Sequence, residues 1–281
     1  MPPSEAPSQS SLPTPPTESF GKTQGLSLLL LLAVSVGVRV FCLACKPFWF
    51  DECFSVELAR ISWHNFVRLL WWREANMSLY YLLLRIWLHF GQSPSFVRGL
   101  SVLFSVATLP AIYWLARLLY DRKVALISAS LFAFNAYSLR YAQEARSYAL
   151  FLLLATLSSA SLIVFLRTPG PRTRLSYIVT SILAAHAHFY ALLLMAAHWL
   201  ALRFAVSSFD FQLSSGTDSR NLKPETPNST RPLGKAWRVI AIAVAPLLIF
   251  VAKTGAGPIR WIHRPSVRDV LDFYAHLAGG N

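Results

Sequence analysis

Long apolar runs recur through most of this chain, and they restrict the folds that it can adopt. A helix needs about 20 mainly apolar residues to cross the hydrocarbon core of a bilayer, and the runs 25–45, 96–120 and 148–166 are of that kind. The chain is 54% hydrophobic and only 14% charged, which is too little charge to cover a soluble domain of this length. We therefore expect an all-α, polytopic membrane protein.

The apolar runs predict about seven spans. The stretch 175–204 is too long for one straight span, so we divide it at His188-Phe189-Tyr190 into two short helices. Arg39, the charged residue of the first span, lies near its outer end and can extend to the lipid headgroups. The predicted spans are 25–45, 96–120, 124–139, 148–166, the two halves of 175–204, and 239–252.

The segment 79–90 is apolar but too short to span, and Arg85 lies at its middle. At 1.5 Å per residue it covers roughly 18 Å of a core about 30 Å thick. We therefore predict a helix that reclines at the membrane interface, and the apolar spacing in 266–277 predicts another. This topology makes 46–95 an external loop and 253–281 an external juxtamembrane segment.

The polar parts of the chain complete the predicted organisation around a transmembrane domain at 25–252. Residues 1–24 are rich in Pro, Ser and Thr and predict a disordered tail, and the stretch 205–238 predicts a flexible loop. The positive-inside rule favours a cytoplasmic location for both, together with the basic connectors between spans. Those connectors contain Arg122, Lys123, Arg167, Arg172 and Arg174.

The net charge of +13 indicates contact with the lipid bilayer rather than with nucleic acid, because no nucleic-acid-binding motif accompanies the basic residues. The cysteines are Cys42, Cys45 and Cys53, and none has zinc-ligand spacing to a nearby histidine. We predict no metal site. Cys42 and Cys45 end an apolar run, so we expect two buried thiols rather than redox chemistry or a required disulfide.

Asp51 and Glu52 form the most informative polar pair, just beyond the first predicted span. Adjacent carboxylates at the membrane surface are costly to desolvate unless they have a partner or a role, and a general base that activates a hydroxyl needs such a group. The alternative is a solvated pair at the start of a helix over 53–61, where acids favour the positive end of the dipole.

Other polar clusters recur on the face that this topology assigns to Asp51. Each also fits an ordinary interface contact or an internal ion pair when it is considered alone. On a common face, however, they can bind a sugar or the phosphate of a lipid. The candidate substrate-binding residues are Glu74, Asn76, Arg98, Gln143, Glu144, Arg146, His188, Tyr190 and Arg260.

The order of these motifs resembles the GT-C membrane glycosyltransferases, especially the dolichyl-phosphate-mannose-protein mannosyltransferase family and its bacterial Rgt-like and aminoarabinose-transferase relatives. The resembling stretch is about 48–204. It contains Phe50-Asp51-Glu52, Glu74-Ala75-Asn76-Met77-Ser78-Leu79-Tyr80-Tyr81-Leu82-Leu83-Leu84, Arg98-Gly99-Leu100-Ser101, Tyr141-Ala142-Gln143-Glu144-Ala145-Arg146-Ser147-Tyr148 and His188-Phe189-Tyr190-Ala191-Leu192-Leu193.

The resemblance implies a catalytic base at Asp51 with Glu52 beside it, a second acid at Glu144, and juxtamembrane helices over 51–62, 79–90 and 266–277. It implies attack of an acceptor hydroxyl on the sugar of a polyprenyl-phosphate donor, with inversion and without a further cofactor. A bacterial relative of this kind would lie in the inner (cytoplasmic) membrane with its N-terminus in the cytoplasm.

The chain departs from the family at two points. Met77-Ser78 stands where the family commonly has two prolines. The relatives also continue with further spans, so we expect either a truncated product or a second chain that supplies them. The alternatives to an enzyme are a non-catalytic or partner-dependent subunit that binds polyprenyl lipids, and a transporter of lipid-linked sugars.

Overall fold

The computed structural model describes residues 22–215, 230–254, 266 and 268–269, and within these parts of the chain the regular secondary structure is helical with no strand. The all-α class is therefore confirmed. The helices are α1 (Lys22–Val40), α2 (Phe50–Arg60), α3 (Trp63–Trp72), α4 (Ser78–Trp87), α5 (Pro94–Leu119), α6 (Arg122–Phe134), α7 (Ala136–Ala142), α8 (Tyr148–Arg167), α9 (Pro171–Ala187), α10 (Ala191–Ser215) and α11 (Thr230–Thr254).

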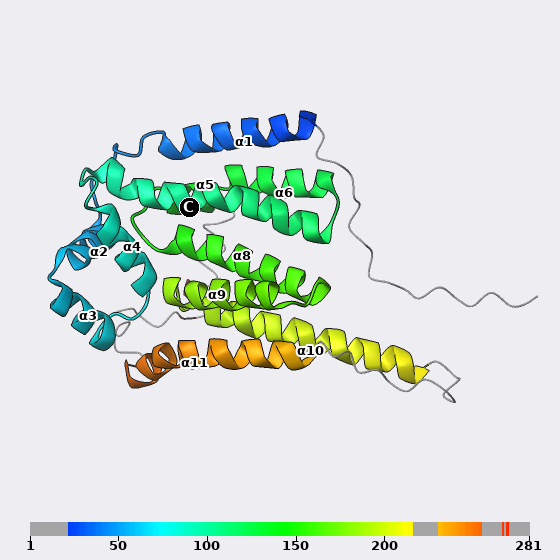
Figure 1. Cartoon of the computed structure of the whole chain (residues 1–281). Helices are drawn as coiled ribbons and strands as arrows, with labels where there is room; N and C mark the ends of the chain where they lie inside the picture. The colour runs from blue at the N-terminus through cyan, green and yellow to red at the C-terminus, as the bar shows by residue number, and fades with distance from the viewer. Residues whose placement is uncertain (1–21, 216–229, 255–265, 267, 270–281) are drawn as a thin grey trace, which may run out of the picture.

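The long helices lie side by side in one bundle, and three short helices gather at one end of it (Figure 1). That end, which we call the α2–α4 end, is where α1 finishes and α5 begins. At the opposite end α5 leads into α6 and α8 leads into α9. Successive long helices therefore alternate in direction where short connections join them.

Three helices are long and apolar enough to cross a membrane, namely Pro94–Leu119, Tyr148–Arg167 and Leu233–Thr254 in the described part of the chain. The helices Gly25–Val40 and Ala191–Arg203 are apolar but shorter. This supports a membrane protein, although fewer helices meet the requirement than the seven or so predicted spans. One reason is that α9 ends at Ala187 and carries Arg172 and Arg174 in its first turn.

The prediction of a single helix over 124–139 is wrong, because the helix is interrupted at Asn135. The side chain of Asn135 accepts a hydrogen bond of 3.0 Å from the Ser138 backbone N–H and so caps α7. Asparagine is favoured at this position because its short side chain satisfies a free donor of the first turn. The predicted division of 175–204 is confirmed, since α9 ends at Ala187 and α10 begins at Ala191.

Contrary to our expectation, Arg39 does not extend to the headgroups. Its side chain is fully buried between α1, α5, α6 and α7, where it donates to Ser105 Oγ at 2.8 Å, Ser138 Oγ at 2.7 Å and the Ala133 carbonyl at 3.1 Å. Neutral acceptors from three neighbouring helices thus replace water around the guanidinium. This arginine joins α1 to the rest of the bundle.

The predicted external loop 46–95 folds into three helices. Two of them, α2 and α4, correspond to the juxtamembrane helices expected over 51–62 and 79–90, and α3 was not predicted. Arg85 of α4 donates to the carbonyls of Ala59 at 3.1 Å and Ile61 at 2.7 Å. Arg85, whose charge argued against a span at 79–90, therefore caps the carboxyl end of α2.

Helix also extends into the stretch 205–238, which we predicted as a loop. Helix α10 continues to Ser215 and α11 begins at Thr230, so any connection between them is shorter than expected. Three regions with predictions lie largely or entirely outside the described residues: the tail 1–24, the middle of that loop, and the segment 253–281 with its helix at 266–277 and Arg260.

Candidate functional site

A buried ion pair between Glu52 and Arg98 organises the α2–α4 end. Glu52 lies in the first turn of α2 and is fully buried, and its Oε1 and Oε2 accept hydrogen bonds from Arg98 of α5 at 2.9 and 2.7 Å. Oε1 also accepts from the Ala145 backbone N–H at 2.9 Å. Since these donors occupy both oxygens, Glu52 connects α2 to α5 and to the turn before α8, and its carboxylate has no free face for a substrate.

Arg98 reaches a second group of acceptors in the chain that follows α1. It donates to the carbonyls of Leu43 and Lys46, both at 2.8 Å, and of Pro47 at 3.0 Å. A buried guanidinium requires acceptors for its donors. Arg98, a predicted substrate-binding residue, therefore donates its hydrogen bonds to groups of the protein itself.

Asp51 is placed differently from its neighbour. Its side chain remains 35% exposed and forms an ion pair of 3.2 Å with Arg146, whose side chain is 11% exposed. In the first turn of α2, Glu52 thus points into the protein, whereas Asp51 lies at the surface of the α2–α4 end. Of the two carboxylates that the sequence predicted as catalytic, Asp51 is the one that a solute can reach.

Glu74 adds a second carboxylate near Arg146. Burial raises the pKa of Glu74, the Arg146 guanidinium opposes this increase, and the Asp51 carboxylate adds to it. Asp51 and Glu74 therefore interact with one shared arginine. Burial and the nearby Asp51 charge together favour the protonated form of Glu74.

Three buried side-chain groups in this region have no hydrogen-bond partner in the described structure, one of them the Ser147 hydroxyl. The other two are the Tyr81 hydroxyl and Arg146 Nε. Burial, together with the negative charge of Glu74, raises the pKa of Tyr81, so its phenol keeps its proton. Buried donors are normally satisfied, and these two point to acceptor groups that a bound molecule would bring.

A row of aromatic rings continues from this polar centre toward the turn between α9 and α10. The ring of Tyr148 lies 4.6 Å from that of Tyr141 and 5.6 Å from that of His188, and His188 lies 4.4 Å from Tyr190. Burial and the nearby Arg146 charge lower the pKa of His188 to about 4. His188 is therefore neutral near pH 7, while Tyr190 at the end of the row is exposed.

The remaining predicted residues do not all meet at the polar centre. Asn76 accepts a hydrogen bond of 3.1 Å from the Phe189 backbone N–H, so it joins the start of α4 to the turn between α9 and α10. Gln143 donates to the Arg39 and Phe41 carbonyls at 3.1 and 2.9 Å. Glu144 pairs with Arg140 at 3.2 Å. Asn76 and Gln143 thus connect separate chain segments, whereas the Glu144–Arg140 pair lies within one segment.

A disulfide joins Cys42 and Cys45 in the turn after α1, and both residues are exposed. Our expectation of two buried thiols is wrong. The reason is that α1 ends at Val40, before the cysteines, so they lie in a tight turn and not in an apolar helix. Cys53 of α2 is a free, exposed cysteine.

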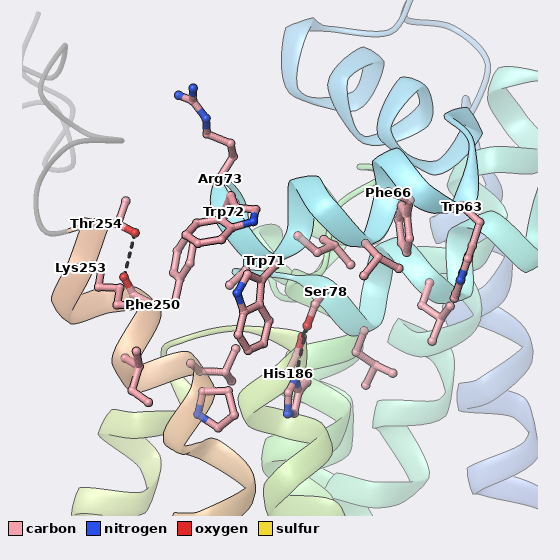
Figure 2. A pocket seen from close by; sticks show the side chains of 18 of the residues that line it. Trp63, Phe66, Trp71, Trp72, Arg73, Ser78, His186, Phe250, Lys253 and Thr254 are labelled. Atoms are coloured by element: carbon pink, nitrogen blue, oxygen red, sulfur yellow. Dashed lines mark hydrogen bonds between the residues drawn. The ribbon is translucent and has the colours of Figure 1, made fainter.

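An apolar pocket of about 970 Å³ opens beside the polar centre, between α3, α4, α9 and α11. Figure 2 shows its labelled residues: Trp71 and Trp72 from α3, Phe250 and Lys253 from α11, with Ser78 and His186 between the two walls. Ser78 donates to the His186 carbonyl at 3.3 Å. Among the described residues, the lining has cations at Arg73 and Lys253 and contains no carboxylate.

The segment 73–78 separates the pocket from the polar centre. Ala75 and Ser78 line the pocket, whereas Glu74 interacts with Arg146 and Asp51. Met77 within this segment has a left-handed backbone conformation with φ of 65°, which turns the chain into α4. The sequence already singled out this segment, but the pocket depends on α11, which is distant in the chain.

Sequence reasoning did not select Tyr81 or Tyr148 as site residues. Tyr81 lies within an apolar run whose pattern indicates packing, and the buried position of the ring agrees with that pattern. Its unpartnered hydroxyl is apparent only from the structure. Tyr148 could have been found from the sequence, because it follows Arg146 at the end of the same polar cluster.

No family model, curated protein or solved structure matched the chain in three comparisons. Within the described residues there is also no group of three or more His, Cys, Asp or Glu side chains arranged to hold a metal ion.

Proposed function

We propose that this protein is a membrane glycosyltransferase that moves a sugar from a polyprenyl-phosphate donor to an acceptor hydroxyl. The observation that carries the proposal is the partly exposed Asp51 carboxylate, held 3.2 Å from Arg146 and separated by the segment 73–78 from a large apolar pocket. A reaction on a lipid-linked sugar needs both a polar centre and a place for an apolar chain.

Asp51 would act as the general base. It takes the proton of the acceptor hydroxyl while that oxygen forms a bond to the anomeric carbon of the sugar. The bond from the anomeric carbon to the phosphate oxygen breaks, and polyprenyl phosphate leaves with the electron pair. A single displacement of this kind inverts the anomeric configuration.

Arg146 would stabilise the charge that develops on the departing phosphate. Its Nε has no partner within the described structure, and a guanidinium close to a phosphate oxygen stabilises the transition state more than the ground state. Glu74 and the Tyr81 hydroxyl lie beside it as groups that can bind the hydroxyls of the sugar. The exposed ring of Tyr190 offers a further contact.

The pocket between α3, α4, α9 and α11 suits the isoprenoid chain of the donor. Its walls are mainly tryptophan, leucine and phenylalanine. Arg73 and Lys253 provide positive charge, and no carboxylate is among the described residues of the lining. An amphiphile with an anionic head matches that distribution of charge.

The same proposal places the α2–α4 end on the external face of the inner membrane, within a GT-C-type bundle whose juxtamembrane helices include α2 and α4. The exposed disulfide at Cys42 and Cys45 supports this orientation, because disulfides persist outside the reducing cytosol. The basic residues at the opposite end, such as Arg122 and Arg172, support a cytoplasmic location for that end.

A lipid-binding membrane subunit without catalysis is the second candidate. The size of the apolar pocket favours it, because binding a polyprenyl lipid requires the pocket alone. The two candidates differ in what they require of Asp51, which lies outside the pocket lining.

The test uses the full chain in lipid nanodiscs with polyprenyl-phosphate mannose and polyprenyl-phosphate glucose as donors. Release of polyprenyl phosphate and binding of the donor are measured for the wild type and for Asp51→Asn. We expect Asp51→Asn to reduce turnover at least about 100-fold, the lower range for loss of a general base, with donor binding within about threefold.

Glu57→Gln is the matched control, because Glu57 lies on the same helix with a side chain that is 70% exposed. It should retain turnover. Donor binding without turnover in the wild type, with either donor, would favour the lipid-binding subunit over the enzyme.

A further inference from the structure

The disulfide turn after α1 belongs to the hydrogen-bonded network of the candidate site. Cys42 and Cys45 close a four-residue turn, and Cys42 adopts a left-handed backbone conformation with φ of 58°. A residue other than glycine rarely keeps this conformation unless its surroundings hold it. The cross-link is one such constraint, and both cysteines are exposed to solvent.

The turn presents its carbonyl groups to Arg98. Leu43 lies between the two cysteines and Lys46 follows the second, and both of their carbonyls accept hydrogen bonds of 2.8 Å from Arg98. On the other side of the turn, Gln143 donates to the Phe41 carbonyl at 2.9 Å. The shape of the turn therefore determines where Arg98 finds its acceptors.

Arg98 in turn determines the position of the carboxylate pair. It holds both oxygens of Glu52, at 2.9 and 2.7 Å, and Glu52 accepts the Ala145 N–H at 2.9 Å. Asp51 precedes Glu52 and Arg146 follows Ala145, so one network fixes both members of the Asp51–Arg146 ion pair. A continuous path of hydrogen bonds and neighbouring residues thus runs from the disulfide to the candidate base.

We propose that Cys42 and Cys45 are positioning residues for Asp51, and that reduction of their disulfide slows the transfer while leaving donor binding largely unchanged. This inference rests on the proposed function for its effect on turnover. It does not depend on that function for its effect on the network, because the contacts of Arg98 and Glu52 exist without a substrate.

The redox step is an ordinary thiol–disulfide exchange with a dithiol reductant. The thiolate of the reductant attacks one sulfur of the Cys42–Cys45 bond and forms a mixed disulfide. The second thiol of the reductant then attacks this mixed disulfide and releases the remaining protein thiol. The protein gains two electrons and two protons to give two thiols, and the reductant becomes a cyclic disulfide. The exposed position of both cysteines gives the reductant access.

The experiment uses the full chain with Cys53→Ser, which removes the free thiol that could exchange with the disulfide. This protein is studied with and without dithiothreitol, beside a protein that also carries Cys42→Ser and Cys45→Ser. Two quantities are measured: kcat and KM with the donor that turns over, and the hydrogen-exchange rate of the Ala145 amide, which donates to Glu52.

We expect reduction to lower kcat about 10- to 100-fold, the cost typical of a small displacement of a reacting group, while KM changes less than about threefold. The Ala145 amide should exchange faster. The protein without Cys42 and Cys45 should behave like the reduced protein and should not respond to dithiothreitol.

Equal Ala145 exchange rates in the oxidised and reduced proteins would overturn the inference, as would an unchanged kcat in an active protein. If no donor turns over, the proposed function fails, and the amide exchange still decides whether the disulfide positions the network. If the triple variant does not fold, reduction of the Cys53→Ser protein provides the same comparison.

Discussion

The two ends of the helical bundle hold their charged side chains in different ways. At the α2–α4 end, acids and bases are paired across helices, as in the buried pair of Glu52 with Arg98 and the partly exposed pair of Asp51 with Arg146. At the opposite end, basic residues follow one another on the connectors and helix ends. They include Arg117, Arg122, Lys123, Arg167, Arg172 and Arg174, and they accompany Asp121, which caps α6.

The α2–α4 end is thus a fixed polar centre, whereas at the opposite end the combined positive charge matters more than any single residue. Charges taken out of water persist only where partners compensate their desolvation, so each residue of the α2–α4 end depends on a particular neighbour. Of the basic residues at the opposite end, Lys123 and Arg172 are exposed and the others are partly exposed. Cations near a membrane surface act together through orientation and contact with anionic headgroups. Single substitutions should therefore have large effects at one end and small effects at the other.

The largest effect on stability is expected from Arg98→Met, which leaves Glu52 buried without its cation. Breaking a buried ion pair costs about 3–5 kcal/mol, measured as the free energy of unfolding in detergent. Arg172→Met is the matched change at the opposite end, where the side chain is exposed, and should cost less than about 0.5 kcal/mol. Similar losses for the two variants would remove the proposed contrast between the ends.

A smaller effect of opposite sign is expected from Glu74→Gln. The pKa of Glu74 is raised by burial, so above the pKa of the unfolded chain the ionised carboxylate is less favourable in the folded protein than in the unfolded one. The neutral amide should raise Tm at pH 7 by about 1–3 °C. The gain should disappear below about pH 4, where the carboxyl is protonated in both states; a lower Tm at pH 7 would contradict this assignment.

The smallest change in the pH dependence of stability is expected from His188→Asn and should appear in acid. Because the pKa of His188 is lowered to about 4, the unfolded chain binds a proton between about pH 6.5 and 4 that the folded protein does not. Stability of the wild type should fall across that window, and the variant should fall less steeply. His64→Asn, at an exposed position on α3, is the control; equal slopes for His188→Asn and the wild type would exclude the assigned shift.

Much of the helical plan could be predicted because apolar runs and polar connectors alternate clearly along the chain. The division at His188-Phe189-Tyr190 followed from the length of the apolar run, and the short helix near 79–90 followed from its length together with the charge of Arg85. The break at Asn135 was missed because the apolar pattern continues across it. The inward position of Arg39 depends on acceptors from α5, α6 and α7, which no local pattern contains.

The candidate site was predicted in part for a related reason. Sequence position drew attention to Asp51 and Glu52 together, but only the fold distinguishes the paired and buried Glu52 from the accessible Asp51. The disulfide was missed because the helix was expected to include Cys42 and Cys45, whereas α1 ends at Val40. A tertiary contact decided the first case, and the position at which a helix ends decided the second.

The most direct test of the central claim compares two aspartate variants, Asp51→Asn at the α2–α4 end and Asp121→Asn at the opposite end, in the donor-turnover assay. Asparagine can retain the cap that Asp121 provides to Val124 N at 2.8 Å, so Asp121→Asn should stay within about threefold of the wild type. Asp51→Asn should lose at least about 100-fold in turnover while it still binds donor. Wild-type turnover in Asp51→Asn, or an equal loss in both variants, would contradict the assignment of the chemistry to Asp51.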